Sequence, residues 1–130
     1  MTRALKAALP HFRGPLTNLN QIIHNPGTIP DARFLTSCNL TVVFEGTYST
    51  YQIYGFSKTI SSFMSSSKCE RDNLACIIHG LPANISSNDM NNLIKDVRSL
   101  AGSVFMTGLS VDYYASFWQG WSGFVDEMDK

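Results

Sequence analysis

Charged residues are scarce in this sequence, and they form no cluster of one sign. They make up 15% of the 130 residues, against roughly 25% in an average soluble protein, and ten basic residues balance ten acidic ones. No run of lysine and arginine offers the basic surface that nucleic acids or anionic lipids bind. No apolar run approaches the roughly 18 residues of a membrane-spanning helix. We therefore expect neither a nucleic-acid partner nor a membrane span.

The sequence also lacks the motifs of common metal and cofactor sites. Its three cysteines, Cys38, Cys69 and Cys76, have no CxxC spacing, so zinc is not expected. There is no Gly-rich phosphate loop and no nucleophile elbow. Cys76 lies in an apolar run, which favours a small buried hydrophobic residue. The sequence does not decide whether Cys69 and Cys76 form a disulfide. What remains is polar chemistry centred on carboxylates, with no cofactor.

The signals for cellular location disagree. The first ten residues contain no apolar segment of about 7–15 residues, which taken literally predicts a cytosolic protein. Two triplets, Asn39-Leu40-Thr41 and Asn84-Ile85-Ser86, fit the N-glycosylation acceptor pattern and indicate a secretory origin.

The sequence does contain a repeated order of short apolar runs, each followed by a helical stretch. Four apolar runs predict β-strands: residues 18–24, 40–45, 74–79 and 103–107. The spacing of apolar residues outside these runs predicts helices: residues 31–35, 48–64, 88–100 and 112–128. Such apolar strands are typical of parallel sheets, and alternation with helices favours right-handed crossovers. We therefore expect an α/β fold of parallel (β/α) units, a single domain over residues 1–130 with residues 1–17 as an irregular N-terminal segment.

Glu45 is the candidate catalytic residue. It closes the second predicted strand, and the carboxyl ends of parallel strands are where such sheets bind ligands. A carboxylate is costly to bury without a reason, so Glu45 reads as a general acid, base or nucleophile. A solvated position past the strand end, or an ion pair, explains it equally well.

Five further polar or aromatic residues are candidates for substrate binding. Asn25 and Thr28 follow the first strand, where they can hydrogen-bond a polyhydroxylated ligand or simply form an Asn-Pro-Gly turn. His79 ends the third strand, where sugar binding, proton transfer and a structural hydrogen bond are the alternatives. Tyr48 and Tyr51 can stack against a ligand, although one of them is expected to be ordinary packing.

Glycoside hydrolysis fits this carboxylate-centred chemistry. It uses two carboxyl groups, roughly 5–5.5 Å apart in retaining enzymes and roughly 6.5–9.5 Å apart in inverting ones. Glu45 supplies one of them, and no other predicted strand ends in aspartate or glutamate.

The order of these residues resembles spherulation-specific family 4, the spherulin-4-like cell-surface proteins of fungi. The resemblance covers about residues 18–128 and is to the C-terminal half of the family pattern. It rests on NPGT at 25–28, LTVVFEGTY at 40–48, IIH at 77–79 and SVFMT at 103–107, with Tyr113, Tyr114 and Trp121 after them.

The resemblance implies a secreted (β/α)8 barrel of the glycoside hydrolase family 135 type. It further implies an endo-α-1,4-galactosaminidase that acts on galactosamine-containing fungal polysaccharide, with Glu45 as one active-site acid. In the family an Asp-Glu pair from the N-terminal half supplies the other acids. Asp126-Glu127 lies in the last predicted helix and does not correspond to that pair, and the family tends to have aspartate where Gly108 stands.

The resemblance also implies that the chain represents strands five to eight of such a barrel. Four strands cannot close a barrel, so we expect self-association through unpaired sheet edges. The expected protein is a truncated relative of these hydrolases, inactive alone, extracellular or on the cell surface, and a partner of polysaccharide. The alternatives are a non-catalytic carbohydrate-binding or cell-surface module and an open flavodoxin-like domain, which would lack the usual phosphate loop.

Overall fold

One parallel sheet organises the fold. The computed structural model describes residues 22–37 and 39–130, and its strands lie in the order β1-β2-β3-β4, every neighbouring pair being parallel. The strands are β1 (Ile23–His24), β2 (Leu40–Thr47), β3 (Leu74–His79) and β4 (Ser103–Met106). Because sequential strands are adjacent and parallel, each connection crosses over the sheet. The predicted α/β fold of parallel (β/α) units is confirmed.

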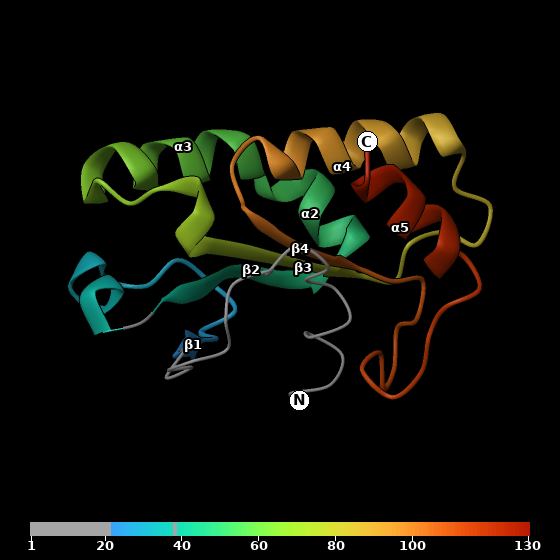
Figure 1. Cartoon of the computed structure of the whole chain (residues 1–130), viewed down its shortest axis with the longest axis horizontal. Helices are drawn as coiled ribbons and strands as arrows, with labels where there is room; N and C mark the ends of the chain where they lie inside the picture. Colours follow the sequence, from blue (N-terminus) through green and yellow to red (C-terminus); the bar gives the residue numbers. More distant parts are fainter. Residues whose placement is uncertain (1–21, 38) are drawn as a thin grey trace.

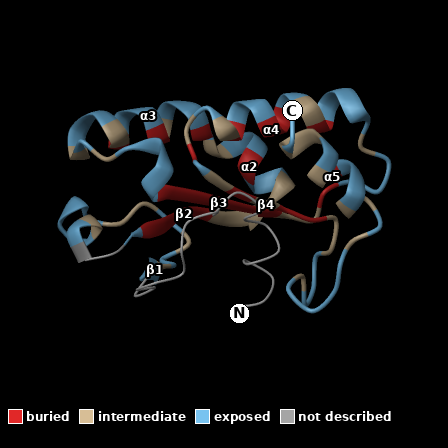
Figure 2. Ribbon diagram, in the orientation of Figure 1, coloured by how far each residue is buried: buried red, intermediate tan, exposed pale blue. Residues whose placement is uncertain are grey.

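Helices cover one face of this sheet (Figure 1). These are α2 (Tyr48–Tyr54), α3 (Phe56–Ser67), α4 (Ser87–Arg98) and α5 (Trp121–Met128). The connections also contain two short 3-10 helices, η1 (Ala32–Ser37) and η2 (Arg71–Asn73). Figure 2 shows the buried residues on the strands and on the sheet-facing sides of the helices. Among the described residues, no helix is long and apolar enough to cross a membrane.

The strand residues divide between two apolar clusters, one on each face of the sheet. The helix-side cluster takes every second residue of β3 and β4: Leu74, Cys76, Ile78, Val104 and Met106. The opposite cluster contains Leu40, Val42, Ala75 and Ile77, with Phe105 and Tyr113 packed against it. A sheet that forms part of a (β/α) barrel has one face toward the helices and one toward the barrel interior, so it carries apolar residues on both faces.

A β-bulge in β2 interrupts this alternation. The pairing with β3 shifts between Val42 and Phe44, and Val43 and Phe44 both belong to the helix-side cluster. After the bulge, Glu45 pairs with Ile77, which belongs to the opposite cluster. A bulge re-aims the side chains that follow it, so Glu45 lies on the face away from the helices.

Local sequence signals account for the helix ends. The Ser86 hydroxyl caps α4, accepting from the Asp89 N–H at 3.0 Å and donating to the Asp89 carboxylate at 2.7 Å. The helix predicted over residues 48–64 is two helices, because Gly55 between them has a φ of 65°. Glycine adopts this left-handed conformation at little cost and ends a helix there.

The predicted helix over residues 112–128 is wrong in its first half. The helix α5 begins only at Trp121, because Asp112 has a φ of 49° and the residues after it form turns. The Trp118 indole packs on the backbone of this segment, where a Cβ on Gly120 would lie 2.4 Å from the ring. The aromatic spacing that resembled a helical stripe therefore serves loop packing.

The remaining predictions concern the cysteines and the N-terminal part of the chain. Cys69 and Cys76 are both free thiols, so the disulfide that the sequence left open is absent from the described residues. Cys76 is fully buried and burial raises the pKa of its thiol, as expected of a small core residue. Residues 1–17, most of the first predicted strand and Cys38 lie outside the described residues.

Candidate functional site

Three hydrogen-bond donors converge on Glu45 at the carboxyl ends of the strands. Tyr113 Oη donates to Glu45 Oε1 at 2.5 Å, and Tyr114 Oη donates to the same oxygen at 2.8 Å. The Asn25 Nδ2 group donates to Oε2 at 2.8 Å. The donors come from the segments after β1 and after β4, so the strand order brings together residues up to 89 positions apart, from 25 to 114. We call Asn25, Glu45, His79, Tyr113 and Tyr114 the Glu45 cluster.

The Asn-Pro-Gly turn after β1 holds Asn25 in place. The Asn25 Oδ1 atom accepts from the Gly27 N–H at 3.1 Å, and the Gly27 carbonyl accepts from the Glu45 N–H at 3.1 Å. Gly27 has a φ of +66°, and a Cβ there would lie 3.6 Å from Glu45 Cβ. The two interpretations of Asn25 from the sequence, turn former and hydrogen-bond donor, therefore apply to the same side chain.

His79 supports the cluster from β3. Its ring stacks on Tyr113 with centroids 4.3 Å apart and planes 5° apart, and Tyr113 in turn contacts Tyr114 with ring centroids 4.5 Å apart. Among the described residues, the buried Nδ1 atom of His79 has no hydrogen-bond partner. The stack fixes the plane of Tyr113, and so the direction in which its hydroxyl reaches Glu45.

The cluster keeps Glu45 ionised. Burial raises the pKa of Glu45, but the hydrogen bonds from Tyr113, Asn25 and Tyr114, together with the nearby His79, outweigh it and hold the pKa below its ordinary value. Burial and the Glu45 charge raise the pKa of both tyrosines, which therefore stay protonated donors. At neutral pH the site therefore presents an ionised Glu45 carboxylate and two protonated tyrosine hydroxyls.

This lowered pKa predicts a pH-dependent contribution to stability. A carboxyl group whose pKa is lower when folded stabilises the protein above its unfolded pKa, and that stability is lost as the pH falls through the folded pKa. We expect Glu45→Gln to lower the free energy of unfolding most above about pH 5, and progressively less below the ordinary glutamate pKa of about 4.3. Urea unfolding across a pH series measures this. Glu70→Gln, at an exposed position, is the control, and a difference that grows toward low pH would contradict the assignment.

An aromatic-lined cavity of about 400 Å³ adjoins the cluster. Tyr113 and Tyr114 belong to its wall, which also includes Phe105, Phe117, Trp118 and Trp121. Phe117 is 66% exposed, so part of this aromatic wall is open to solvent. The Trp118 indole packs directly on Gly108, where a Cβ atom would lie 2.3 Å from Trp118 Nε1. An aspartate at position 108 would displace that ring.

The structure brings together some of the predicted site residues and not others. Asn25, Glu45 and His79 meet, whereas Thr28 is exposed beyond the turn and has no described contact with Glu45. Tyr48 begins α2 and packs against the helix-side cluster. The ring of Tyr51 is buried in that cluster, and its hydroxyl donates to Asp96 Oδ2 at 2.5 Å. A ligand contact by Thr28, Tyr48 or Tyr51 stays a prediction.

Tyr113 and Tyr114 are the site residues that the sequence pattern assigned elsewhere. The spacing of Tyr113 with later aromatic residues predicted a helix that would include both tyrosines, and this prediction hid their role. Their position could have identified them. The two adjacent tyrosines follow the fourth predicted strand, and Glu45 ends the second predicted strand, so all three belong to the same edge of a parallel sheet.

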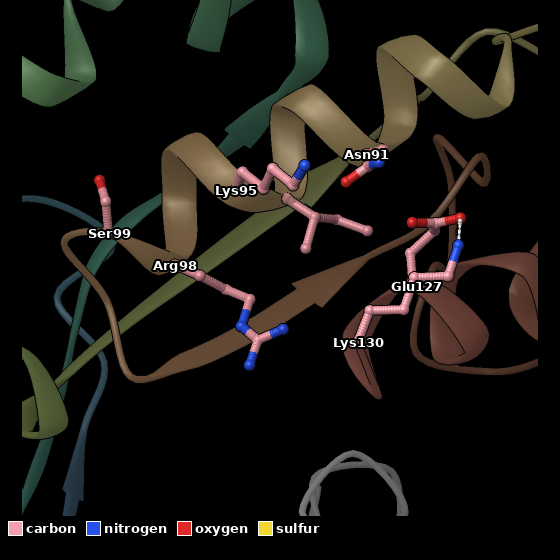
Figure 3. Close-up of a pocket in the computed structure, with 7 residues that line it drawn as sticks. Asn91, Lys95, Arg98, Ser99, Glu127 and Lys130 are labelled. Atoms are coloured by element: carbon pink, nitrogen blue, oxygen red, sulfur yellow. Dashed lines mark hydrogen bonds and ion pairs between the residues drawn. The ribbon is translucent and has the colours of Figure 1, made fainter.

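A second cavity, of about 510 Å³, lies between α4 and α5 (Figure 3). Its wall includes Lys95, Arg98, Glu127 and Lys130. Lys130 pairs with Glu127 at 2.6 Å, and Arg98 Nη1 donates to the Met128 carbonyl at 2.9 Å. Arg98 thus lies in the last turn of α4, where the helix dipole favours positive charge, and binds a backbone carbonyl at the end of α5. The cavity lies in the helical layer, on the other side of the sheet from the Glu45 cluster.

No described residues form a group of three or more side chains suited to a metal ion. The described site offers one carboxylate, two tyrosine hydroxyls, an amide, an imidazole and a set of aromatic faces.

Comparison with known proteins found a solved structure that is similar to this chain. The chain is similar to the protein in the crystal structure of Aspergillus clavatus Sph3 in complex with GalNAc, with 40% sequence identity and a TM-score of 0.78. The match covers 85% of this chain and 42% of that one, so the chain spans less than half the length of Sph3. A comparison with the curated proteins found no match.

The family comparison covers almost the whole sequence. The family described as Spherulin4, spherulation-specific family 4, matches residues 1–128, and this range includes every residue of the Glu45 cluster. The fold of the described residues, a parallel sheet with helices on one face, is consistent with half of a (β/α)8 barrel. The chain belongs to spherulation-specific family 4.

Proposed function

We propose that the chain forms one wall of the cleft of an endo-α-1,4-galactosaminidase-type glycoside hydrolase that binds galactosamine-containing polysaccharide. The observation that carries this proposal is the carboxylate of Glu45, fixed by three donors beside an aromatic-lined cavity. We also propose that these 130 residues alone do not hydrolyse the polysaccharide.

The chemistry of the site suits an amino sugar. A ring such as galactosamine offers an apolar C–H face to an aromatic side chain, and its hydroxyls can hydrogen-bond the tyrosine and amide groups of the cluster. Its ammonium group carries a positive charge that the ionised Glu45 attracts. The cavity volume of about 400 Å³ lies within the roughly 300–1,000 Å³ of ligand pockets.

The charge state of Glu45 favours one of the two catalytic roles. Glycoside hydrolysis needs a general acid, whose pKa is raised, and a second group that acts as a carboxylate. Glu45 has a lowered pKa, so it fits the second role, as a base, a nucleophile or a stabiliser of positive charge. Among the described residues, Glu45 is the carboxylate that hydrogen-bonds within the cluster. This is why we expect no turnover without a further acid.

Galactosaminogalactan, a galactosamine-containing polysaccharide, tests both parts of the proposal. Incubated with the insoluble polysaccharide, the chain is expected to sediment with it and to release no oligosaccharides above the level of a buffer control. Failure to sediment would contradict carbohydrate binding. Oligosaccharide release that disappears in Glu45→Ala would contradict the inactivity, while leaving the assignment of Glu45 intact.

A non-catalytic carbohydrate-binding module is the alternative, favoured by the exposed Phe117 beside the cluster. Such a module would keep its affinity in Glu45→Ala and lose it in Phe117→Ala, which glycan-array binding distinguishes.

Location and assembly are further proposals. Family membership supports an extracellular or cell-surface location, which fractionation of the native cells checks. Among the described residues, β1 and β4 each have a strand neighbour on one side only. This supports self-association through the sheet edges, and sedimentation velocity would reveal it.

A further inference from the structure

The two N-glycosylation triplets lie in very different places in the fold. Asn84 lies in a turn between β3 and α4, where the Ile85 N–H donates to the Pro82 carbonyl at 3.1 Å. Its side chain is exposed, and among the described residues no hydrogen bond engages its amide. Ser86, the third residue of the triplet, is also exposed.

Asn39, in contrast, immediately precedes β2 and is tied to neighbouring segments by hydrogen bonds. Its Oδ1 atom accepts from the Ile22 N–H at 2.9 Å, and its carbonyl accepts from Asn73 Nδ2 at 3.3 Å. The next two residues begin β2, where Leu40 is 4% exposed and Thr41 is 1% exposed. The hydroxyl-bearing residue of this triplet is therefore inside the protein.

The free-energy cost of presenting each triplet to a transferase differs accordingly. The enzyme must reach the asparagine amide and the third residue's hydroxyl together, which is why acceptor sites lie in surface loops. Presenting Ser86 requires opening only its cap on Asp89, a single local contact at the end of a helix. Presenting Thr41 requires removing β2 from the middle of the sheet, an opening that approaches global unfolding.

We propose that Asn84 is an N-glycosylation site and that Asn39 is not. The donor is an oligosaccharide linked to a lipid diphosphate. The Asn84 Nδ2 atom forms a bond to sugar C1, the bond from C1 to the diphosphate oxygen breaks, and the amide gives up one proton as the lipid diphosphate leaves. The inference rests on passage through the secretory pathway and is independent of hydrolysis at Glu45.

The position of Asn84 places the glycan at the ligand-binding edge of the sheet. The connection that carries it leaves the carboxyl end of β3 and is tied to the end of β4, because Gly80 N–H donates to the Leu109 carbonyl at 2.9 Å and Leu81 N–H donates to the Thr107 carbonyl at 3.1 Å. A glycan on Asn84 would project from the carboxyl ends of the strands and would not cover the helices.

The test is to express the chain in yeast behind a secretion signal and to map its glycans by peptide mass spectrometry, before and after peptide N-glycosidase. Chain retained in the cell is analysed in the same way, so poor secretion cannot hide the result. We expect one glycan, lost in Asn84→Gln and kept in Asn39→Gln. A glycan on Asn39, alone or together with one on Asn84, would overturn the proposal, and so would an unmodified Asn84.

A matched pair of substitutions at Ser86 tests whether modification requires the hydroxyl of the third residue. Ser86→Thr keeps both the acceptor pattern and a capping hydroxyl, and it is expected to stay glycosylated. Ser86→Ala removes the acceptor hydroxyl while Asn84 remains, and it is expected to lose the glycan. Modification of Ser86→Ala to the wild-type level would also overturn the proposal.

Discussion

Replacing Glu45 by glutamine is expected to lower the affinity for a deacetylated galactosamine oligosaccharide by about 10- to 100-fold, equivalent to about 1.4–2.7 kcal/mol. Glutamine keeps the shape of the side chain but removes the negative charge that attracts the sugar ammonium group. It also turns an amide N–H2 group toward a donor, because Asn25 Nδ2 and the two tyrosine hydroxyls all donate to the present carboxylate. Isothermal titration calorimetry measures the change.

The N-acetylated form of the same oligosaccharide provides the internal comparison. It is uncharged, so Glu45→Gln is expected to weaken its binding by only a few-fold, through the disturbed hydrogen bonds. Glu70→Gln makes the same chemical change at an exposed position before β3 and is expected to leave both affinities unchanged. Equal losses for the charged and uncharged sugars would show that the charge of Glu45 does not recognise the ammonium group. Thermal unfolding of each variant confirms that the comparison is between folded proteins.

The second large effect concerns stability, at the contact between α2 and α4. Asp96 accepts from Tyr51 Oη at 2.5 Å and from Ser57 Oγ at 2.9 Å. The residue Tyr51 is 8% exposed, so Asp96→Ala would leave its hydroxyl without a partner among buried groups. Losing a hydrogen bond to a charged group and leaving a buried donor unpaired is expected to lower the free energy of unfolding by about 2–4 kcal/mol.

The reverse substitution is expected to cost less. Tyr51→Phe leaves the exposed Asp96 free to bind water, so we expect a loss of about 1–2 kcal/mol. Urea unfolding of the two single variants and the double variant completes a double-mutant cycle. Asp126→Ala, an exposed change on α5, controls for removing a helical aspartate. Equal losses from the two single variants would contradict the asymmetry, because they would mean that the Tyr51 hydroxyl is as well solvated as Asp96.

Sequence reasoning predicted the elements whose signals are local. The run from Leu74 to His79 is a strand over those same residues, because an uninterrupted apolar run of this length suits a strand buried on both faces. A serine before an amphipathic stretch is a signal for a helix start; of the two serines available here, Ser86 is the cap of α4. Asn25, Glu45 and His79 could be grouped because parallel strands bring their carboxyl ends to one edge.

The rest depended on contacts between distant parts of the chain. A spacing of three and four residues between aromatic side chains predicts a helix, and Tyr113, Phe117 and Trp121 have that spacing. Tyr113 and Tyr114 instead hydrogen-bond a carboxylate 68 and 69 residues away, and Trp118 packs on Gly108. Neither partner is visible in a local window, so tertiary contacts outweighed the helical pattern.

The shifted pairing at Val43 has a consequence for comparing relatives of this chain. Successive side chains in a strand point to opposite faces of the sheet. Because Leu40 and Val42 lie on the face away from the helices, strict alternation would place residue 45 on the helix side. The extra residue of the bulge shifts this alternation by one position, so that the Glu45 carboxylate lies on the same face as the two tyrosines. A homologue that gains or loses one residue here without a compensating bulge would keep a recognisable glutamate in its alignment column, yet that glutamate would belong to the wrong side of the sheet.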